Sequence, residues 1–305
     1  MQSLASFVMR GRLQAVSAAA LLAVLAWSFS LLGVLSAAVV ALVTLRHGSN
    51  EGLVTIVLAS LVSAVLGLLA LGNVAPALAT LALVWTPTWL IAIVLRNSRS
   101  LALAVQGGVL FGLTVIVVYH GVMPDPIADW REILQTFSQP LVEAEVLSQA
   151  QQLELVDSFA PWMTGFVAVG SYLQLVAGLM LARWWQATMF NPGGFREEFH
   201  NLRMHRVMAY IAFPVLVFGI NTEMTGVGLL VNYVAMLLMT AYFLQGLAFV
   251  HGAVALFGAS SGWLFGMYVL LILAMPNMFG LLFAAGYADA WFDFRARIRA
   301  SRDAD

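Results

Sequence analysis

Apolar segments about as long as a bilayer is thick follow one another along this chain. Residues 53–71, 77–95 and 101–119 contain no charged side chain, and the apolar runs 13–45 and 227–257 extend over 33 and 31 residues. A helix rises about 1.5 Å per residue, so about 20 apolar residues cross a hydrocarbon core of roughly 30 Å. The sequence therefore predicts several membrane-spanning helices.

The composition favours helices over the other ways of crossing a membrane. Hydrophobic residues make up 62% of the 305 residues and charged residues 10%, against roughly half and a quarter in soluble domains. Gly and Ala are scattered through the apolar runs, and the alternating polarity that is typical of transmembrane strands does not occur. We therefore predict an all-α fold, a polytopic transmembrane helical bundle of about 8 to 10 spans.

Missing residue types exclude several activities. Cysteine is absent, which excludes disulfides, thiolate metal sites and cysteine nucleophiles. All 14 basic residues are Arg, so the chain has neither a Schiff-base lysine nor the lysine of a phosphate-binding P-loop. No metal-ligand spacing and no catalytic motif occurs, so the sequence indicates no metal, no catalytic residue and no particular cofactor. A membrane enzyme whose groups meet only in the fold stays open as a third alternative.

A change in composition divides the chain into three parts. Residues 1–119 hold the N-terminal transmembrane helices, and residues 120–160 form an acidic segment. Residues 161–305 hold the C-terminal transmembrane helices, together with a predicted amphipathic helix at 195–206 and a basic tail.

The acidic segment carries seven Asp and Glu residues against Arg131 alone. Asp129 begins a capping-box pattern, and apolar residues follow at helical intervals. We expect one amphipathic helix before Pro140 and a second one after it, because proline interrupts helices. The segment is predicted to be a helical insertion at the extracytoplasmic, or periplasmic, membrane surface.

Arg residues set the expected orientation, because basic side chains in short loops stay in the cytoplasm. Residues 13–45 form either two short helices or a span plus a half-helix, with a bend around Ser28–Gly33. All Arg residues outside 120–160 can stay in the cytoplasm if these residues cross twice. Both termini then lie on the cytoplasmic side of a bacterial inner membrane, which requires an even number of crossings, whereas nine apolar segments are apparent. We expect residues 227–257 to cross twice, with a break near Gln245–Gly246; a re-entrant segment is the alternative.

Polar side chains at membrane depth mark the candidate ligand site, because such groups are costly there. The ionisable ones are Glu223, His251 and Asp289. Gln245 lies well inside an apolar run, where it either forms a hydrogen bond between helices or lines a cavity. We predict a cavity lined by four residues of the C-terminal part: Asn232, Gln245, His251 and Asn277.

The stretch "NPGGFREEFHNLRMHR", residues 191–206, interrupts two apolar runs. Its Pro-Gly-Gly triplet predicts a turn. Aromatic and basic side chains then recur at helical spacing, which predicts a short amphipathic helix on the cytoplasmic leaflet. We assign contacts with lipid or with a partner to five of its residues: Phe195, Arg196, Phe199, Arg203 and Arg206.

Three motifs suggest a family. "NPGGFREEFHNLR", "YFLQGLAFVH" and "DAWFDFRARIR" occur in this order, and together they resemble the YybS-like family of uncharacterised bacterial membrane proteins over nearly the whole chain. The resemblance implies a distant relationship to the substrate-binding (S) components of energy-coupling-factor vitamin transporters, whose small residues on the first helix meet a coupling subunit. That contact would fall on Ala15, Ala19 and Ala23, a small-residue ladder that would serve internal packing equally well.

Two hypotheses for the function follow. The first is a multi-pass inner-membrane protein of the transporter-like class, similar to an S component, that binds a small or amphipathic ligand and couples to a partner subunit. The second is a membrane scaffold that has no ligand and docks a protein partner through its Arg-rich cytoplasmic elements. The lipid bilayer is a partner in both, and nucleic acid is a partner in neither.

Overall fold

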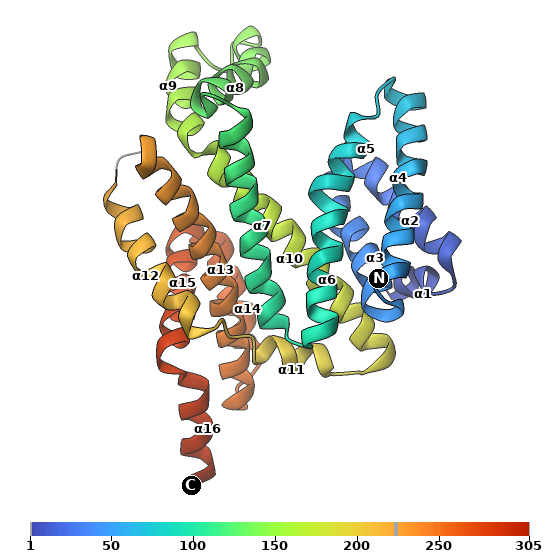
Figure 1. Ribbon diagram of the computed structural model, residues 1–305. Coiled ribbons are helices and arrows are strands. Elements are labelled where there is room, and N and C mark those ends of the chain that lie inside the picture. The colour runs from blue at the N-terminus through green and yellow to red at the C-terminus, as the bar shows by residue number, and fades with distance from the viewer. Residues whose placement is uncertain (1, 223–224, 305) are drawn as a thin grey trace.

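A computed structural model describes residues 2–222 and 225–304, which form helices joined by short turns (Figure 1). Glu223 lies outside the described residues. Five helical stretches are long and apolar enough to cross a membrane: Ser49–Leu71, Ala75–Ser98, Leu101–Val122, Gln149–Phe190 and Gly226–Leu256. The predicted all-α helical bundle of a membrane protein is confirmed.

The N-terminal part begins with α1 (Gln2–Val8), α2 (Arg12–Ala26), α3 (Leu31–His47) and α4 (Ser49–Leu71). The 33-residue apolar run is thus two antiparallel helices separated by residues 27–30, as predicted. An ion pair of 2.7 Å between Arg12 and Glu51 joins the starts of α2 and α4.

The next crossing contains a local widening of the helix. It consists of α5 (Ala75–Thr80), a π-helical turn η1 (Leu81–Trp85) and α6 (Thr86–Ser98). Pro87 follows the widened turn; a proline has no backbone N–H and its ring would meet the carbonyl of the preceding turn, which the wider turn accommodates. The adjoining helix α7 (Leu101–Val122) runs back in the opposite direction.

The acidic segment forms α8 (Pro126–Glu143) and α9 (Gln149–Phe159). The predicted helix end at Pro140 is wrong, because α8 continues to Glu143 with that proline in its last turn. The helix begins one turn earlier than the Asp129 pattern suggested, since the Asp125 side chain accepts the hydrogen bond from Ala128 N.

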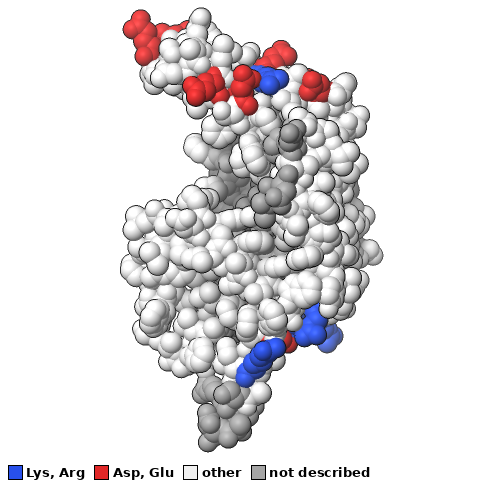
Figure 2. All heavy atoms as spheres, turned by 90° about the vertical axis from the view of Figure 1, so that its left-hand side faces the viewer, with Lys and Arg blue, Asp and Glu red and all other residues white. Residues whose placement is uncertain are grey.

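The two ends of the molecule differ in charge. Acidic side chains gather at one end and Arg side chains at the other (Figure 2). α8 and α9 lie at the former, which we name the acidic end, and the loops after α3 and α6 lie toward the latter, the basic end (Figure 1). Between the ends, large apolar side chains such as Leu31, Leu69 and Ile272 are about four-fifths exposed, which is compatible with contact to lipid.

A long central helix, α10 (Met163–Phe190), joins the two halves of the bundle and packs against α3 and α7. Its start is tied to the acidic end by a hydrogen bond of 3.0 Å from Trp130 Nε1 to Thr164 Oγ1. The remaining helices are α11 (Gly194–His200), α12 (Arg206–Asn221), α13 (Gly226–Leu256), α14 (Gly262–Leu273), α15 (Met275–Phe292) and α16 (Phe294–Ala304).

The reversal of the chain lies elsewhere than predicted. The single helix α13 (Gly226–Leu256) covers all but the last residue of the run 227–257, so the expected break near Gln245–Gly246 is wrong. Instead, the apolar residues 263–286 divide at Ala274 into α14 and α15. α14 has only 12 residues, about 18 Å at the helical rise, and is too short to cross a bilayer alone.

α13 and α15 touch backbone to backbone. A Cβ on Gly246 would lie 1.9 Å from the carbonyl oxygen of Leu282, and one on Gly286 would lie 2.0 Å from that of Tyr242. Only glycine fits at these two positions, because any side chain would drive the helices apart. Gly246 therefore serves close packing, where the sequence had suggested a helix break.

Candidate functional site

The stretch after α11 inserts into the basic end of the bundle. α11 ends at His200, so the predicted helix 195–206 is wrong in its second half. Residues 201–205 are not helical; Leu202 and Met204 are 1% exposed, whereas the residues between and beside them face outward or lie half-buried. This alternation is typical of extended backbone. We name residues 201–205 the inserted segment.

Side chains from three helices hold the backbone of the inserted segment. Gln245 Oε1 accepts a hydrogen bond of 2.9 Å from Met204 N, and Gln106 Oε1 accepts one of 3.0 Å from His205 N. Arg295 donates to the carbonyl oxygens of His200, at 2.7 Å, and Leu202, at 2.9 Å. The segment therefore links α13, α7 and α16.

A buried ion pair lies beneath this segment. Arg295 Nη2 donates to Asp289 Oδ2 at 2.6 Å, and Gln245 Nε2 donates to the same oxygen at 3.1 Å. The other carboxylate oxygen, Oδ1, is buried and has no hydrogen-bond partner. A buried charge is stable only when it is paired and hydrogen-bonded, so each of these three side chains depends on the other two.

A second ion pair closes the same region. Arg203 pairs with Asp293 and donates to Ala290 O at 3.2 Å. Asp293 lies between α15 and α16 with a positive φ of 50°, and this left-handed backbone turns the chain into α16. Arg203, predicted to contact lipid or a partner, is thus placed in an ion pair within the chain.

A cleft of about 360 Å³ opens beside the inserted segment, between α10, α11 and α13. Arg196 and His200 line it from α11 and His251 from α13, with aromatic walls at Trp184 and Phe199. The His200 and His251 ring centroids are 6.1 Å apart. The pKa of His200 is lowered, first by loss of solvent and then by the positive charges of neighbouring side chains. The lining of this cleft thus contains a guanidinium group and two imidazole rings, and no carboxylate.

The four predicted ligand residues lie apart from one another. Asn232 donates to Gly228 O at 2.9 Å near the acidic end. It lies 13 positions before Gln245 on α13, which is about 20 Å at the helical rise. His251 accepts from or donates to Tyr268 Oη at 2.9 Å, and Asn277 is exposed on α15. Gln245 uses its amide for hydrogen bonds between structural elements, the first of its two predicted alternatives.

The predicted contact residues also differ in exposure. Ala15, Ala19 and Ala23 are buried inside the chain's own bundle, where the backbone of Ala19 accepts a hydrogen bond from Ser36. Arg196 and Arg206 are exposed, whereas Phe195 and Phe199 are half-buried and stack on each other. The ladder thus packs internally, and only part of the 195–206 stretch is on the surface.

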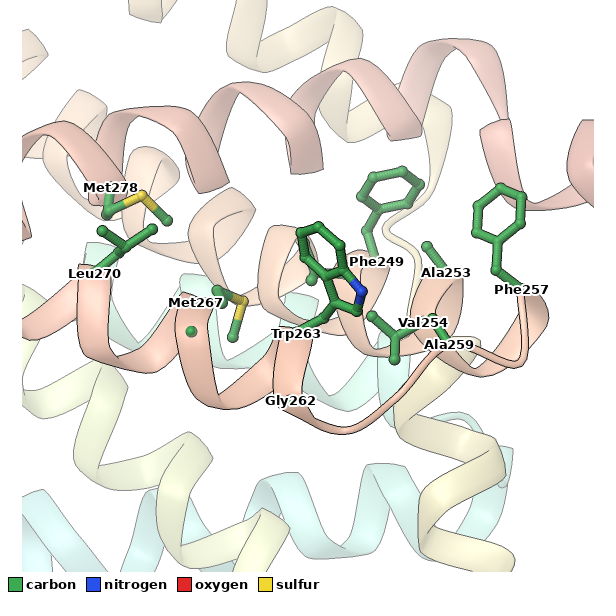
Figure 3. A pocket seen from close by; sticks show the side chains of 12 residues that line it. Phe249, Ala253, Val254, Phe257, Ala259, Gly262, Trp263, Met267, Leu270 and Met278 are labelled. Carbon is green, nitrogen blue, oxygen red and sulfur yellow. The ribbon is translucent and has the colours of Figure 1, made fainter.

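An apolar pocket of about 740 Å³ lies between α13, α14 and the start of α15 (Figure 3). Phe249 and Trp263 lie toward one end of it and Leu270 and Met278 toward the other. This pocket was not expected from the sequence, because it depends on the break at Ala274 between α14 and α15. Met275-Pro276, which is typical of a helix start, was the signal that could have revealed it.

Neither a metal site nor a known relative identifies what the basic cleft or the apolar pocket binds. Within the described residues, no group of three or more His, Asp or Glu side chains is placed to hold a metal ion. The arrangement therefore offers an apolar pocket, a basic cleft and a buried polar network as its distinctive features. No family model, no curated protein and no solved structure matches this chain.

Proposed function

We propose that this membrane protein is a multi-pass, transporter-like protein of the bacterial inner membrane, and that it binds a small amphipathic ligand between α13, α14 and α15. The supporting observation is the apolar pocket of about 740 Å³, whose lining is almost wholly hydrocarbon and aromatic. Ligand pockets of about 300–1,000 Å³ suit small molecules.

α14 acts as the movable wall of the pocket. Met267 is the one buried residue among those of α14, and Ile272 and Leu273 are about four-fifths exposed. A helix with so little buried surface is held weakly, so it can swing away at modest cost. The ligand enters sideways from the bilayer, where apolar compounds are concentrated.

The basic end faces the cytoplasm and the acidic end faces outward in this proposal, as the positive-inside rule requires. The exposed Arg196 and Arg206 then lie where a coupling subunit of the transporter would meet the chain. The resemblance to the YybS-like family and, through it, to S components is part of the same proposal.

The test fills the pocket. Ala253 lines the pocket, whereas Ile272 is exposed and is not part of its lining. Ala253→Phe places an aromatic ring in the pocket, and Ile272→Phe, the control, places one on the outer surface of α14. Each protein is purified from its native membrane, and the retained small molecules are extracted and identified by mass spectrometry. The wild type and Ile272→Phe are expected to retain a compound that Ala253→Phe loses. Equal recovery of every compound from all three proteins contradicts the proposal.

A scaffold function is the second candidate, favoured by the separation of charge in Figure 2. A protein partner would then bind the Arg side chains at the basic end. Replacing Arg196 and Arg206 by Gln should abolish cross-linking to that partner, while Ala253→Phe leaves cross-linking intact. Arg203 is unsuitable for this test, because its ion pair with Asp293 belongs to the fold.

A further inference from the structure

The basic cleft brings together one guanidinium group and two imidazole rings, and no carboxylate lines it. Arg196, His200 and His251 line it. Of the two acids of α11, Glu198 is bound to Arg183 and Glu197 is exposed, and neither lines the cleft. Arg295 lies close enough to act on His200 electrostatically and donates to its carbonyl oxygen. Positive charge gathered in a concave site without a counter-ion attracts anions.

We propose that the cleft between α10, α11 and α13 binds a phosphate ester, held by Arg196, His200 and His251. This site is separate from the apolar pocket, and it goes beyond the proposed function. Arg196 and His200 are four residues apart, which places them on one face of α11, and His251 reaches the same cleft from α13. Guanidinium and imidazolium groups are the donors that bind phosphate oxygens.

The walls of the cleft suit an ester better than inorganic phosphate. Trp184, Phe195 and Phe199 line it together with Ala187, and they offer apolar surface for the organic part of the ligand. The ring of Phe199 meets that of His251 edge-on at 5.5 Å between centroids. The phosphate therefore lies at the cationic side and the organic group against the aromatic side.

The structure of the cleft makes binding depend on pH. Loss of solvent and the charges of Arg196, His251 and Arg295 lower the pKa of His200. A bound phosphate reverses the sign of the local field and favours the protonated ring, so phosphate and proton bind together. The groups that act on His200 are Arg196 from its own helix, His251 from α13 and Arg295 from α16.

The ester has two sources, a lipid headgroup and a water-soluble molecule, and the experiment separates them. Native mass spectrometry of the full chain in detergent measures binding of phosphatidic acid, a lipid with a phosphate monoester. Phosphatidylcholine is the lipid without net charge, and glycerol 3-phosphate is the soluble competitor. Displacement by glycerol 3-phosphate assigns a soluble ester to the site, whereas its failure to displace assigns a lipid; both results support the cleft.

The variants test whether the cleft is responsible. Arg196→Gln combined with His200→Gln is expected to weaken phosphatidic acid binding about 10-fold, because two charge-assisted hydrogen bonds are lost. Arg10→Gln removes an exposed Arg outside the cleft and should leave the affinity within about twofold. Thermal unfolding confirms that each variant is folded. Equal binding by the double variant and by Arg10→Gln overturns the proposal.

The pH arm gives a second readout. Wild-type affinity for phosphatidic acid should rise as the pH falls from about 8 to about 6, where histidine becomes protonated. The lipid phosphate titrates in the same range, so His200→Gln serves as the reference, and the rise must be smaller in that variant. An identical pH profile in the wild type and in His200→Gln removes His200 from the site and overturns its assignment.

Discussion

Asp289 and Arg295 form an ion pair of 2.6 Å in which the two side chains are 0% and 4% exposed. The pair lies where α15 passes into α16, and Arg295 also donates to two carbonyl oxygens near the inserted segment. One buried pair thus connects the C-terminal helices to residues more than ninety positions earlier in the chain.

Breaking this pair should destabilise the protein strongly. Asp289→Ala leaves the Arg295 guanidinium buried without its counter-ion, which costs roughly 3–5 kcal/mol. Arg131→Ala is the control, because it breaks the exposed pair with Asp157 and should cost about 0–1 kcal/mol. Unfolding by SDS in mixed micelles measures both. A loss for Asp289→Ala no larger than that for Arg131→Ala is incompatible with a buried pair.

Gln245 should control the order of the inserted segment. Gln245→Leu removes the acceptor of Met204 N and a donor to Asp289, which leaves buried polar groups unpaired at a cost of about 1–3 kcal/mol. Hydrogen exchange of the peptide around residues 201–205 should speed up. Asn232→Leu, which alters hydrogen bonds near the other end of α13, should leave that peptide unchanged; equal acceleration by both variants excludes a specific role.

The close contact of α13 and α15 predicts opposite effects at two glycines of one helix. Gly286→Ala places a Cβ 2.0 Å from Tyr242 O and should cost about 1–3 kcal/mol, the usual range for overpacking. Gly280→Ala has no heavy atom within 4 Å of its Cβ and should stabilise α15 by about 0.5–1 kcal/mol, because alanine favours helix. Destabilisation by Gly280→Ala as large as that by Gly286→Ala would show that helix spacing is not decisive.

His200 should make stability fall in acid. Its pKa is lowered in the folded chain, so the unfolded chain binds the proton more readily. The contribution is present above the ordinary histidine pKa of about 6.5 and is lost as the pH falls through the lower folded value. Thermal unfolding from about pH 8 to about pH 5, in the absence of phosphate, should show this loss in the wild type. A variant His200→Gln with an undiminished loss would point to another group.

Helix-breaking residues predicted one break correctly and another one wrongly. The break between α2 and α3, at residues 27–30, overlaps the bend predicted around Ser28–Gly33. At Gln245–Gly246 the same kind of signal misled, because Gly246 admits the backbone of α15 and Gln245 bonds to Asp289. Both uses depend on residues about forty positions away, which local propensity does not report.

The candidate sites could be predicted only in part, because they too depend on contacts between residues that are far apart in the sequence. Composition was enough to predict the membrane class, and Arg196 and His251 were singled out as polar or basic residues that call for a partner. Their meeting in one cleft depends on how α11 folds against α13. Arg295 is one of the Arg residues of the basic tail, and nothing in the local sequence distinguishes it from Arg297, which is exposed.

Electron cryo-microscopy of the chain purified from its native membrane tests the central claim, that a ligand occupies the pocket between α13, α14 and α15. The account predicts elongated density between Phe249, Trp263 and Met267 in the wild type and its loss in Ala253→Phe. An empty pocket that α14 has closed in the wild type, with Trp263 packed directly on α13, would contradict it.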